Sequence, residues 1–195
     1  MPNIMIHEKI GYELSKQLNT NSYDYYLGLL SPDTPNLYGF GPKEERWKSH
    51  VRKKDLNEWR KSLKDFYINN KENYNKNFLL GYIIHILTDI IFDDYFYLDI
   101  RKEIIKNNNC DNDKAHIIMR QDMNKYYFNE FEDIKRILSS SNNSYSILNN
   151  TKDNILKWKN LNIEVNITNN TSEYIDEKII NDLVDKVLKE LKQYQ

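Results

Sequence analysis

The sequence predicts an all-α fold, a bundle of about six to eight helices that forms a single domain over residues 1–195. Apolar residues recur at helical spacing along most of the chain, and polar or proline-containing stretches separate these segments. The length of 195 residues suits one compact domain better than two. With only 5 Gly and no Gly-rich phosphate loop, the chain does not fit a nucleotide-binding α/β fold.

The N-terminal segment is expected to be a helix over residues 4–19, where apolar and polar positions alternate at helical spacing. Residues 25–30 predict a short helical or extended piece. Pro32 and Pro35 then predict a loop, because proline restricts both its own backbone and that of the preceding residue. This loop is expected to continue as far as Pro42.

The middle of the chain predicts a charged helical segment and then an apolar helix. Residues 43–70 are charged and of helical composition, and the polar stretch 69–77 leads into the apolar run 78–97. That run is about long enough to span a bilayer. It also carries His85 and Asp89, which are costly in hydrocarbon, so we expect a buried helix instead.

The C-terminal part predicts three more helices separated by polar segments. The expected segments are a turn over 107–113, a helix over about 114–138, a Ser/Asn-rich mobile loop over 139–151, a helix over 152–161, a β-branched stretch over 163–167 and a helix over 173–193.

Composition narrows the class of protein. Lys plus Arg is 28 and Asp plus Glu is 29, so the net charge of −1 provides no strong signal for nucleic-acid binding. The single cysteine, Cys110, excludes an internal disulfide and a thiolate metal cluster. The N-terminus lacks the pattern of a signal peptide and no transmembrane segment is predicted, so we expect a cytoplasmic protein. The oligomeric state cannot be read from the sequence.

Histidine and aspartate residues form the most informative pattern. His85 and Asp89 lie four residues apart within the apolar run, which places them on one helical face. The other histidines are His7, His50 and His116, and Asp33 lies in the proline-framed loop. Together they offer nitrogen and oxygen ligands suited to zinc or another borderline transition metal.

Each of these residues also has a simpler interpretation. A single histidine can be a satisfied core or surface residue, and Asp33 suits an Asx turn or a helix N-cap. Asp93 continues the polar stripe of His85 and Asp89, but it also suits the solvated end of that face. His116 is a weaker candidate, since it can equally be a surface histidine.

The order of these residues resembles the zinc-dependent phospholipase C family, in particular its short, unsecreted bacterial members. The resemblance covers about the first 125 residues and rests on four motifs: His7, the loop Leu29-Leu30-Ser31-Pro32-Asp33, the segment Trp47-Lys48-Ser49-His50, and the helix from Phe78 to Asp89 with its Gly-x-x-x-His-x-x-x-Asp pattern. It implies an all-α bundle around up to three zinc ions that hydrolyses phosphodiester bonds. Single-strand nucleases share this fold.

The resemblance also implies a set of metal ligands. Asp33, His50, His85 and Asp89 would hold one ion, and Asp89 would bridge to a second ion that His7 also holds. For a third ion the chain offers Asp93 and His116, but Arg120 stands where the family has an acidic residue. We therefore expect a site with one or two metals more than one with three, and iron or manganese could replace zinc.

The function that these observations predict is metal-dependent hydrolysis of a small phosphodiester or phospholipid, in which a metal-activated water attacks phosphorus. The resemblance implies Asp33 as the catalytic residue, a ligand that also orients the water. Arg46, Arg52 or Arg120 could bind a phosphate oxygen.

Two alternatives belong to different functional classes. One is a non-catalytic metal-binding structural domain of the same fold with a degenerate site. The other is an HD-type phosphohydrolase, which needs an adjacent His-Asp pair. That pair is missing, because the four histidines precede Glu8, Val51, Ile86 and Ile117.

Overall fold

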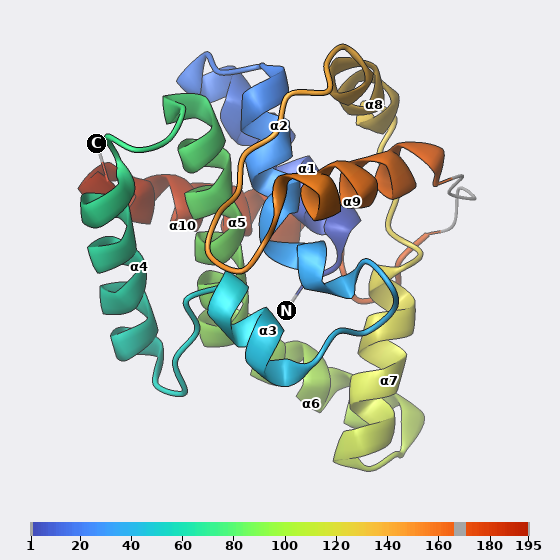
Figure 1. Cartoon of the computed structure of the whole chain (residues 1–195). Helices are drawn as coiled ribbons and strands as arrows, with labels where there is room; N and C mark the ends of the chain where they lie inside the picture. Colours follow the sequence, from blue (N-terminus) through green and yellow to red (C-terminus); the bar gives the residue numbers. More distant parts are fainter. Residues whose placement is uncertain (1, 166–170, 195) are drawn as a thin grey trace.

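The computed structural model describes residues 2–165 and 171–194, which form an all-α bundle (Figure 1). The described helices are α1 (Ile4–Leu18), α2 (Tyr23–Leu30), η1 (Ser31–Asn36), α3 (Lys43–Ser49), α4 (Leu56–Asn70), α5 (Lys76–Tyr95), α6 (Tyr97–Asn108), α7 (Asn112–Met123), α8 (Phe131–Ser139), α9 (Lys152–Glu164), α10 (Glu177–Leu191) and η2 (Lys192–Tyr194), where η marks a 3-10 helix. The predicted all-α class is confirmed, and the described helices exceed the six to eight expected.

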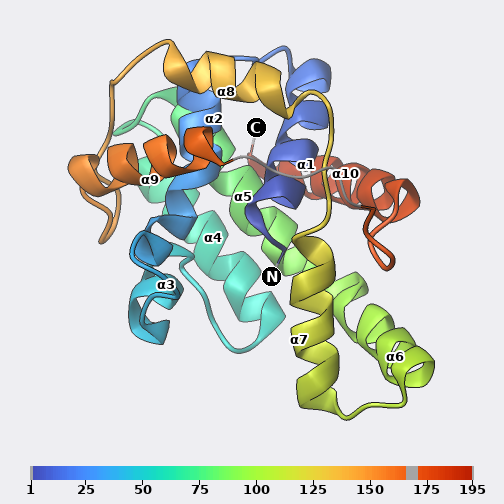
Figure 2. The ribbon, with the colours of Figure 1, turned by 90° about the vertical axis from the view of Figure 1, so that its right-hand side faces the viewer.

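Helix α5 forms the centre of the bundle. Its side chains are buried almost continuously from Phe78 to Phe92, so it is apolar on nearly every face. The helices α1, α2, α4, α6 and α10 all pack against it. Figure 2 shows α6 and α7 side by side, extending away from the rest of the bundle. No described helix is long and apolar enough to cross a membrane.

Two glycines set the close packing of α2 against α5. A Cβ atom at Gly81 would overlap the carbonyl oxygen of Tyr25, and one at Gly28 would overlap that of Phe78. Because neither glycine has a side chain, the two backbones approach closely. This approach brings the end of α2, and η1 after it, next to the face of α5 that carries His85.

The segment from 25 to 70 differs from the expectation in two places. The predicted loop at the prolines is the 3-10 helix η1, which continues directly from α2. The charged segment 43–70 is two helices, because the chain turns between His50 and Asp55. Val51 takes a left-handed φ of 45° there, and the Asp55 carboxylate caps α4 by accepting two backbone N–H groups.

The helix predicted over 78–97 ends earlier, at Tyr95, and α6 follows after Phe96. The single helix predicted over 114–138 is also wrong, since α7 ends at Met123 and α8 begins at Phe131. Contacts from distant residues end α7. The Asn3 side chain donates to the Met123 carbonyl at 2.6 Å, and the Asp122 carboxylate accepts the backbone N–H groups of Glu173 and Tyr174.

The C-terminal elements follow the prediction with shifted ends. Helix α9 extends to Glu164, and α10 begins at Glu177 with Asp176 as its N-cap. Of the predicted β-branched stretch 163–167, the first two residues belong to α9 and the last two lie outside the described residues. The segment 139–151, predicted to be mobile, contacts the bundle, for example through the Asn150 side chain and the Ser31 carbonyl at 2.9 Å.

Candidate metal centre

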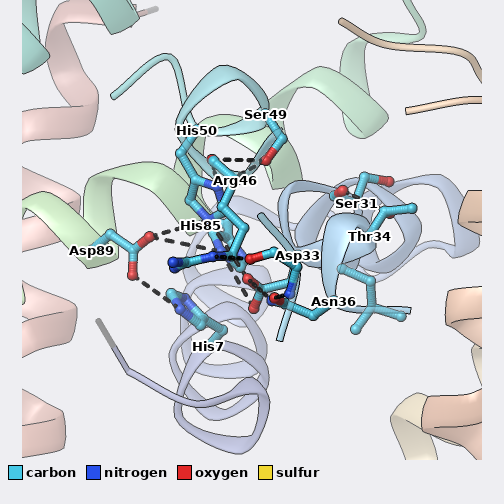
Figure 3. Close-up of polar contacts among 12 residues, drawn as sticks. His7, Ser31, Asp33, Thr34, Asn36, Arg46, Ser49, His50, His85 and Asp89 are labelled. Atoms are coloured by element: carbon cyan, nitrogen blue, oxygen red, sulfur yellow. Dashed lines mark hydrogen bonds and ion pairs between the residues drawn. The ribbon is translucent and has the colours of Figure 1, made fainter. Parts of the chain in front are cut away.

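Five side chains from four parts of the chain converge beside α5 (Figure 3). They are His7 from α1, Asp33 from η1, His50 from the end of α3, and His85 and Asp89 from α5. All five are buried, and four of them are at most 1% exposed. We call this set the His–Asp cluster.

The distances within the His–Asp cluster suit shared ligands better than direct hydrogen bonds. Asp89 Oδ1 lies 3.3 Å from His7 Nε2, and Asp89 Oδ2 lies 3.4 Å from His50 Nε2. His50 Nε2 is also 3.6 Å from Asp33 Oδ1. Two ligand atoms on one tetrahedral zinc ion, each about 2.0–2.1 Å from it, lie about 3.3–3.4 Å apart.

Several polar atoms of the cluster are buried without a hydrogen-bond partner in the part of the chain that the structure describes. They are the Nε2 atoms of His7, His50 and His85 and both carboxylate oxygens of Asp89. A buried polar atom without a partner costs free energy. A single ligand that all of these atoms bind would remove this cost. The residues present therefore fit a metal cation with a preference for nitrogen and oxygen ligands.

Backbone carbonyls orient two of the imidazole rings. His50 Nδ1 lies 2.7 Å from the Arg46 carbonyl oxygen, and His85 Nδ1 lies 2.7 Å from that of Leu29. A proton on Nδ1 satisfies both carbonyls and leaves the lone pair of Nε2 directed into the cluster. The His7 ring stacks on His85 with centroids 3.7 Å apart and planes 6° apart.

Burial also shifts the pKa values of the cluster. It lowers the pKa of His7 and His50 to about 4 and that of His85 to about 3. The three imidazoles are therefore neutral at pH 7, as metal ligands must be. Burial raises the pKa of the Asp33 carboxyl. The charge of Asp89 also raises this pKa, whereas the charges of His50 and His7 lower it.

Asp93 and His116 lie apart from the His–Asp cluster. Asp93 Oδ2 accepts a hydrogen bond from Arg52 at 2.7 Å, in an ion pair between α5 and the turn after α3. His116 on α7 has its Nδ1 3.4 Å from the Tyr97 hydroxyl. Their predicted roles as ligands of a third metal stay predictions.

A cavity of about 520 Å³ opens beside the cluster. Its lining includes Asp33, the arginines Arg46, Arg52 and Arg120, His116, and the aromatic residues Phe40, Trp47 and Trp158. The three arginines that the sequence suggested as phosphate-binding candidates thus lie around one cavity. Because Asp33 belongs to both the cluster and this lining, it connects the candidate metal ligands to the space that a substrate would enter.

Glu8, next to His7 on α1, is a buried titratable residue that the sequence analysis did not single out. It is 1% exposed, and neither of its carboxylate oxygens has a hydrogen-bond partner. Burial raises its pKa to about 8, and the charge of Lys135 opposes this shift. The only sequence signal was its position next to His7. The carbonyls of Leu29 and Arg46 had no signal at all, because every residue has a carbonyl.

The comparisons with known proteins agree with these observations. The family model described as zinc dependent phospholipase C matches residues 5–181 of the chain. This range extends beyond the first 125 residues on which the sequence resemblance rested. No curated protein and no solved structure matches the chain significantly.

Proposed function

The chain belongs to the zinc-dependent phospholipase C family, and from this premise we propose that it is a zinc-dependent hydrolase of phosphodiester bonds. The observation that carries the proposal is the buried His–Asp cluster, where several nitrogen and oxygen atoms lack a hydrogen-bond partner among the described residues, next to a cavity lined by arginines. The proposed substrate is a small phosphodiester or a phospholipid.

The proposed ligand set is the one that the sequence resemblance implies. Asp33, His50, His85 and Asp89 would hold one zinc ion, and His7 and Asp89 would hold a second. The position of Asp89 supports this arrangement, because its two oxygens face His7 and His50 separately. When bound, zinc acts as a Lewis acid and lowers the pKa of a coordinated water toward about 7.

Asp33 is the proposed catalytic residue. Its side chain is 12% exposed, and Oδ1 accepts a hydrogen bond from Asn36 Nδ2 at 3.1 Å, which restrains the carboxylate at the edge of the cavity. There it would orient a water molecule toward phosphorus and accept its proton. The water oxygen would bond to phosphorus, while the ester oxygen leaves and takes up a proton.

The arginines of the cavity would bind the substrate. Arg46 and Arg52 come from α3 and the turn that follows it, and Arg120 comes from α7, so they approach the cavity from two sides. Guanidinium groups form charge-assisted hydrogen bonds with phosphate and carboxylate oxygens, so they would hold the anionic groups of the substrate beside the zinc ligands.

The first test is metal content, measured by mass spectrometry on protein purified without chelators. We expect about one to three equivalents of zinc, iron or manganese in the wild type. His85→Ala and Asp89→Asn should lose most of this metal. Asp94→Asn is the matched control on the same helix and should keep it, because Asp94 pairs with Arg60 at 2.8 Å. A wild type without tightly bound metal would contradict the proposal.

The second test is turnover of bis(p-nitrophenyl) phosphate by the metal-containing protein. We expect hydrolysis that Asp33→Asn lowers by about two orders of magnitude or more, in the range of losing a general base. Stoichiometric zinc without turnover of this or any other phosphodiester would instead support the non-catalytic metal-binding domain.

A further inference from the structure

The cavity beside the His–Asp cluster gathers more positive charge than a single phosphodiester can balance. Arg52 pairs with Asp93 at 2.7 Å. Arg46 and Arg120, by contrast, have no carboxylate within ion-pair distance among the described residues. With one zinc ion balanced by the Asp33 and Asp89 carboxylates, Arg46 and Arg120 bring two positive charges against the one negative charge of a phosphodiester.

Arg46 and Arg120 both pack against the ring of Phe40. The guanidinium carbon of Arg46 is 3.8 Å from the centroid of Phe40, and that of Arg120 is 4.9 Å from it. Phe40 is 67% exposed, so this pair lies at the open side of the cavity. Arg46 also donates from Nε to the Gly41 carbonyl at 2.9 Å, which leaves its two terminal nitrogens available.

The aromatic residues of the cavity do not form a site for a quaternary ammonium group. Arg46 and Arg120 take up Phe40, and Lys43 Nζ lies 4.6 Å from the Trp47 centroid. Among the Phe, Tyr and Trp rings of the described lining, only Trp158 remains. A quaternary ammonium is typically held in a cage of several aromatic rings, so the cavity disfavours a choline-like cation.

We propose that the substrate carries a second anionic group, a carboxylate or another phosphate, which Arg46 and Arg120 bind at the mouth of the cavity. This inference rests on the proposed function, because it assigns the class of phosphodiester that the same site accepts. Burial lowers the pKa of Arg46, and the charge of Arg120 lowers it further, because the two positive charges repel each other in the free protein. A bound anion reduces that repulsion while forming charge-assisted hydrogen bonds. Arg46 and Arg120 would thus determine specificity.

Calorimetric binding of O-phosphoserine and O-phosphoethanolamine to the protein as purified tests the proposal. The two compounds differ by one carboxylate, and as phosphomonoesters they lack the diester bond that the proposed reaction cleaves. We expect phosphoserine to bind about tenfold more tightly, as one hydrogen-bonded charge pair would provide. Phosphocholine should bind no more tightly than phosphoethanolamine.

Variants test whether the two arginines cause the preference for phosphoserine. Arg120→Gln and Arg46→Gln should each reduce it to about twofold or less, whereas Arg46→Lys should keep part of it because the charge remains. Arg136→Gln is the matched control, since Arg136 is exposed on α8 and pairs with Asp133. Equal binding of both compounds by the wild type, or a preference that both glutamine variants keep, would overturn the inference.

The binding readout separates this inference from the proposed function. A protein that prefers phosphoserine but hydrolyses no phosphodiester would support the anionic site and contradict the hydrolase. A protein that hydrolyses phosphodiesters but binds the two phosphomonoesters equally would contradict the anionic site and leave the hydrolase supported.

Discussion

At the scale of single residues, the backbone at Val51 is the clearest sign of strain beside the His–Asp cluster. Its φ of 45° lies in the left-handed region, which costs a non-glycine residue about 1–2 kcal/mol. The position directly follows His50. Hydrogen bonds hold the turn on both sides, from Trp59 Nε1 to the His50 carbonyl at 2.8 Å and from the Arg52 N–H to the Trp47 carbonyl at 2.8 Å. This strain is therefore part of how the fold places the His50 ring.

At Val51, the alanine variant should be less stable than the glycine variant, which is the reverse of the usual order. We expect Val51→Gly to be more stable than Val51→Ala by about 1 kcal/mol, because glycine adopts a positive φ without steric cost. Urea denaturation measures the difference. At the exposed helical position Lys61 in α4, the same pair should show the opposite order. A Val51→Ala protein as stable as Val51→Gly would show that the turn is not strained.

At the scale of elements, the packing of α2 on α5 decides where the cluster forms. The two helices touch through Gly28 and Gly81, and this contact places the Leu29 carbonyl 2.7 Å from His85 Nδ1. Two helices held further apart by larger side chains would lose this hydrogen bond. They would also move Asp33, which follows α2 directly, away from the α5 face.

Gly81→Ala tests this contact. In an exposed helix the change would stabilise the protein by up to about 1 kcal/mol, but here we expect a loss of about 1–3 kcal/mol from overpacking. The new methyl group would meet the backbone of α2, which cannot move without displacing the whole helix. Thermal and urea denaturation measure the loss.

Gly11→Ala is the matched control. The three atoms nearest to its Cβ would all belong to the Leu29 side chain rather than to a backbone, so the loss should be smaller. If Gly81→Ala were as stable as the wild type, the close approach of α2 and α5 would not limit the packing.

The metal content of the Gly81→Ala protein should fall together with its stability, because His85 and Asp33 would separate.

At the scale of the whole molecule, tyrosines supply much of the core of a chain with only 39% hydrophobic residues. Tyr25, Tyr26 and Tyr82 have no exposed surface. Their hydroxyls donate to oxygens of other segments, as Tyr25 does to the Gly11 carbonyl at 2.8 Å and Tyr82 to the Ser49 carbonyl. Large rings with one polar end thus fill the core and connect its helices.

This use of tyrosine predicts a loss of stability at alkaline pH. Burial raises the pKa of Tyr26 to about 12 and those of Tyr25 and Tyr82 well above their usual value of 10. Above pH 10 the unfolded chain releases these protons while the folded protein keeps them. Stability should therefore be unaffected by these groups below pH 10 and fall as the pH rises from 10 toward 12.

Denaturation at a series of alkaline pH values, together with the ultraviolet absorbance of tyrosinate, checks this prediction. The folded protein should form less tyrosinate at a given pH than the same protein in denaturant. Equal titration curves in the two states would contradict it.

The sequence predicted the class of the fold well and the ends of several helices poorly. Helical spacing in α1 and α5 is a local property, so it was visible in the residues themselves. The end of α7 was not, because contacts from Asn3 and from residues 172–174 cause it. The break between α3 and α4 was missed for a similar reason, since no Pro or Gly marks the turn at Val51.

In the candidate site, too, the features that depend on local spacing were predictable and the contacts between distant segments were not. His85 and Asp89 were recognisable because their spacing puts them on one face of an otherwise apolar helix. Asp93 continues that face by spacing, yet the structure pairs it with Arg52 from another segment. Spacing determines the face of a helix on which a residue lies, but it does not determine which other segment packs there.

By itself, the sequence determined the all-α class, the buried central helix and the set of residues able to bind a metal, because each depends on side-chain type and helical periodicity. Only the tertiary structure decided which of these residues meet, which carbonyls orient the imidazoles, and that three arginines share one cavity. The physical reason is that these features depend on how closely helices distant in the sequence approach, and that distance is set by packing, as at Gly28 and Gly81.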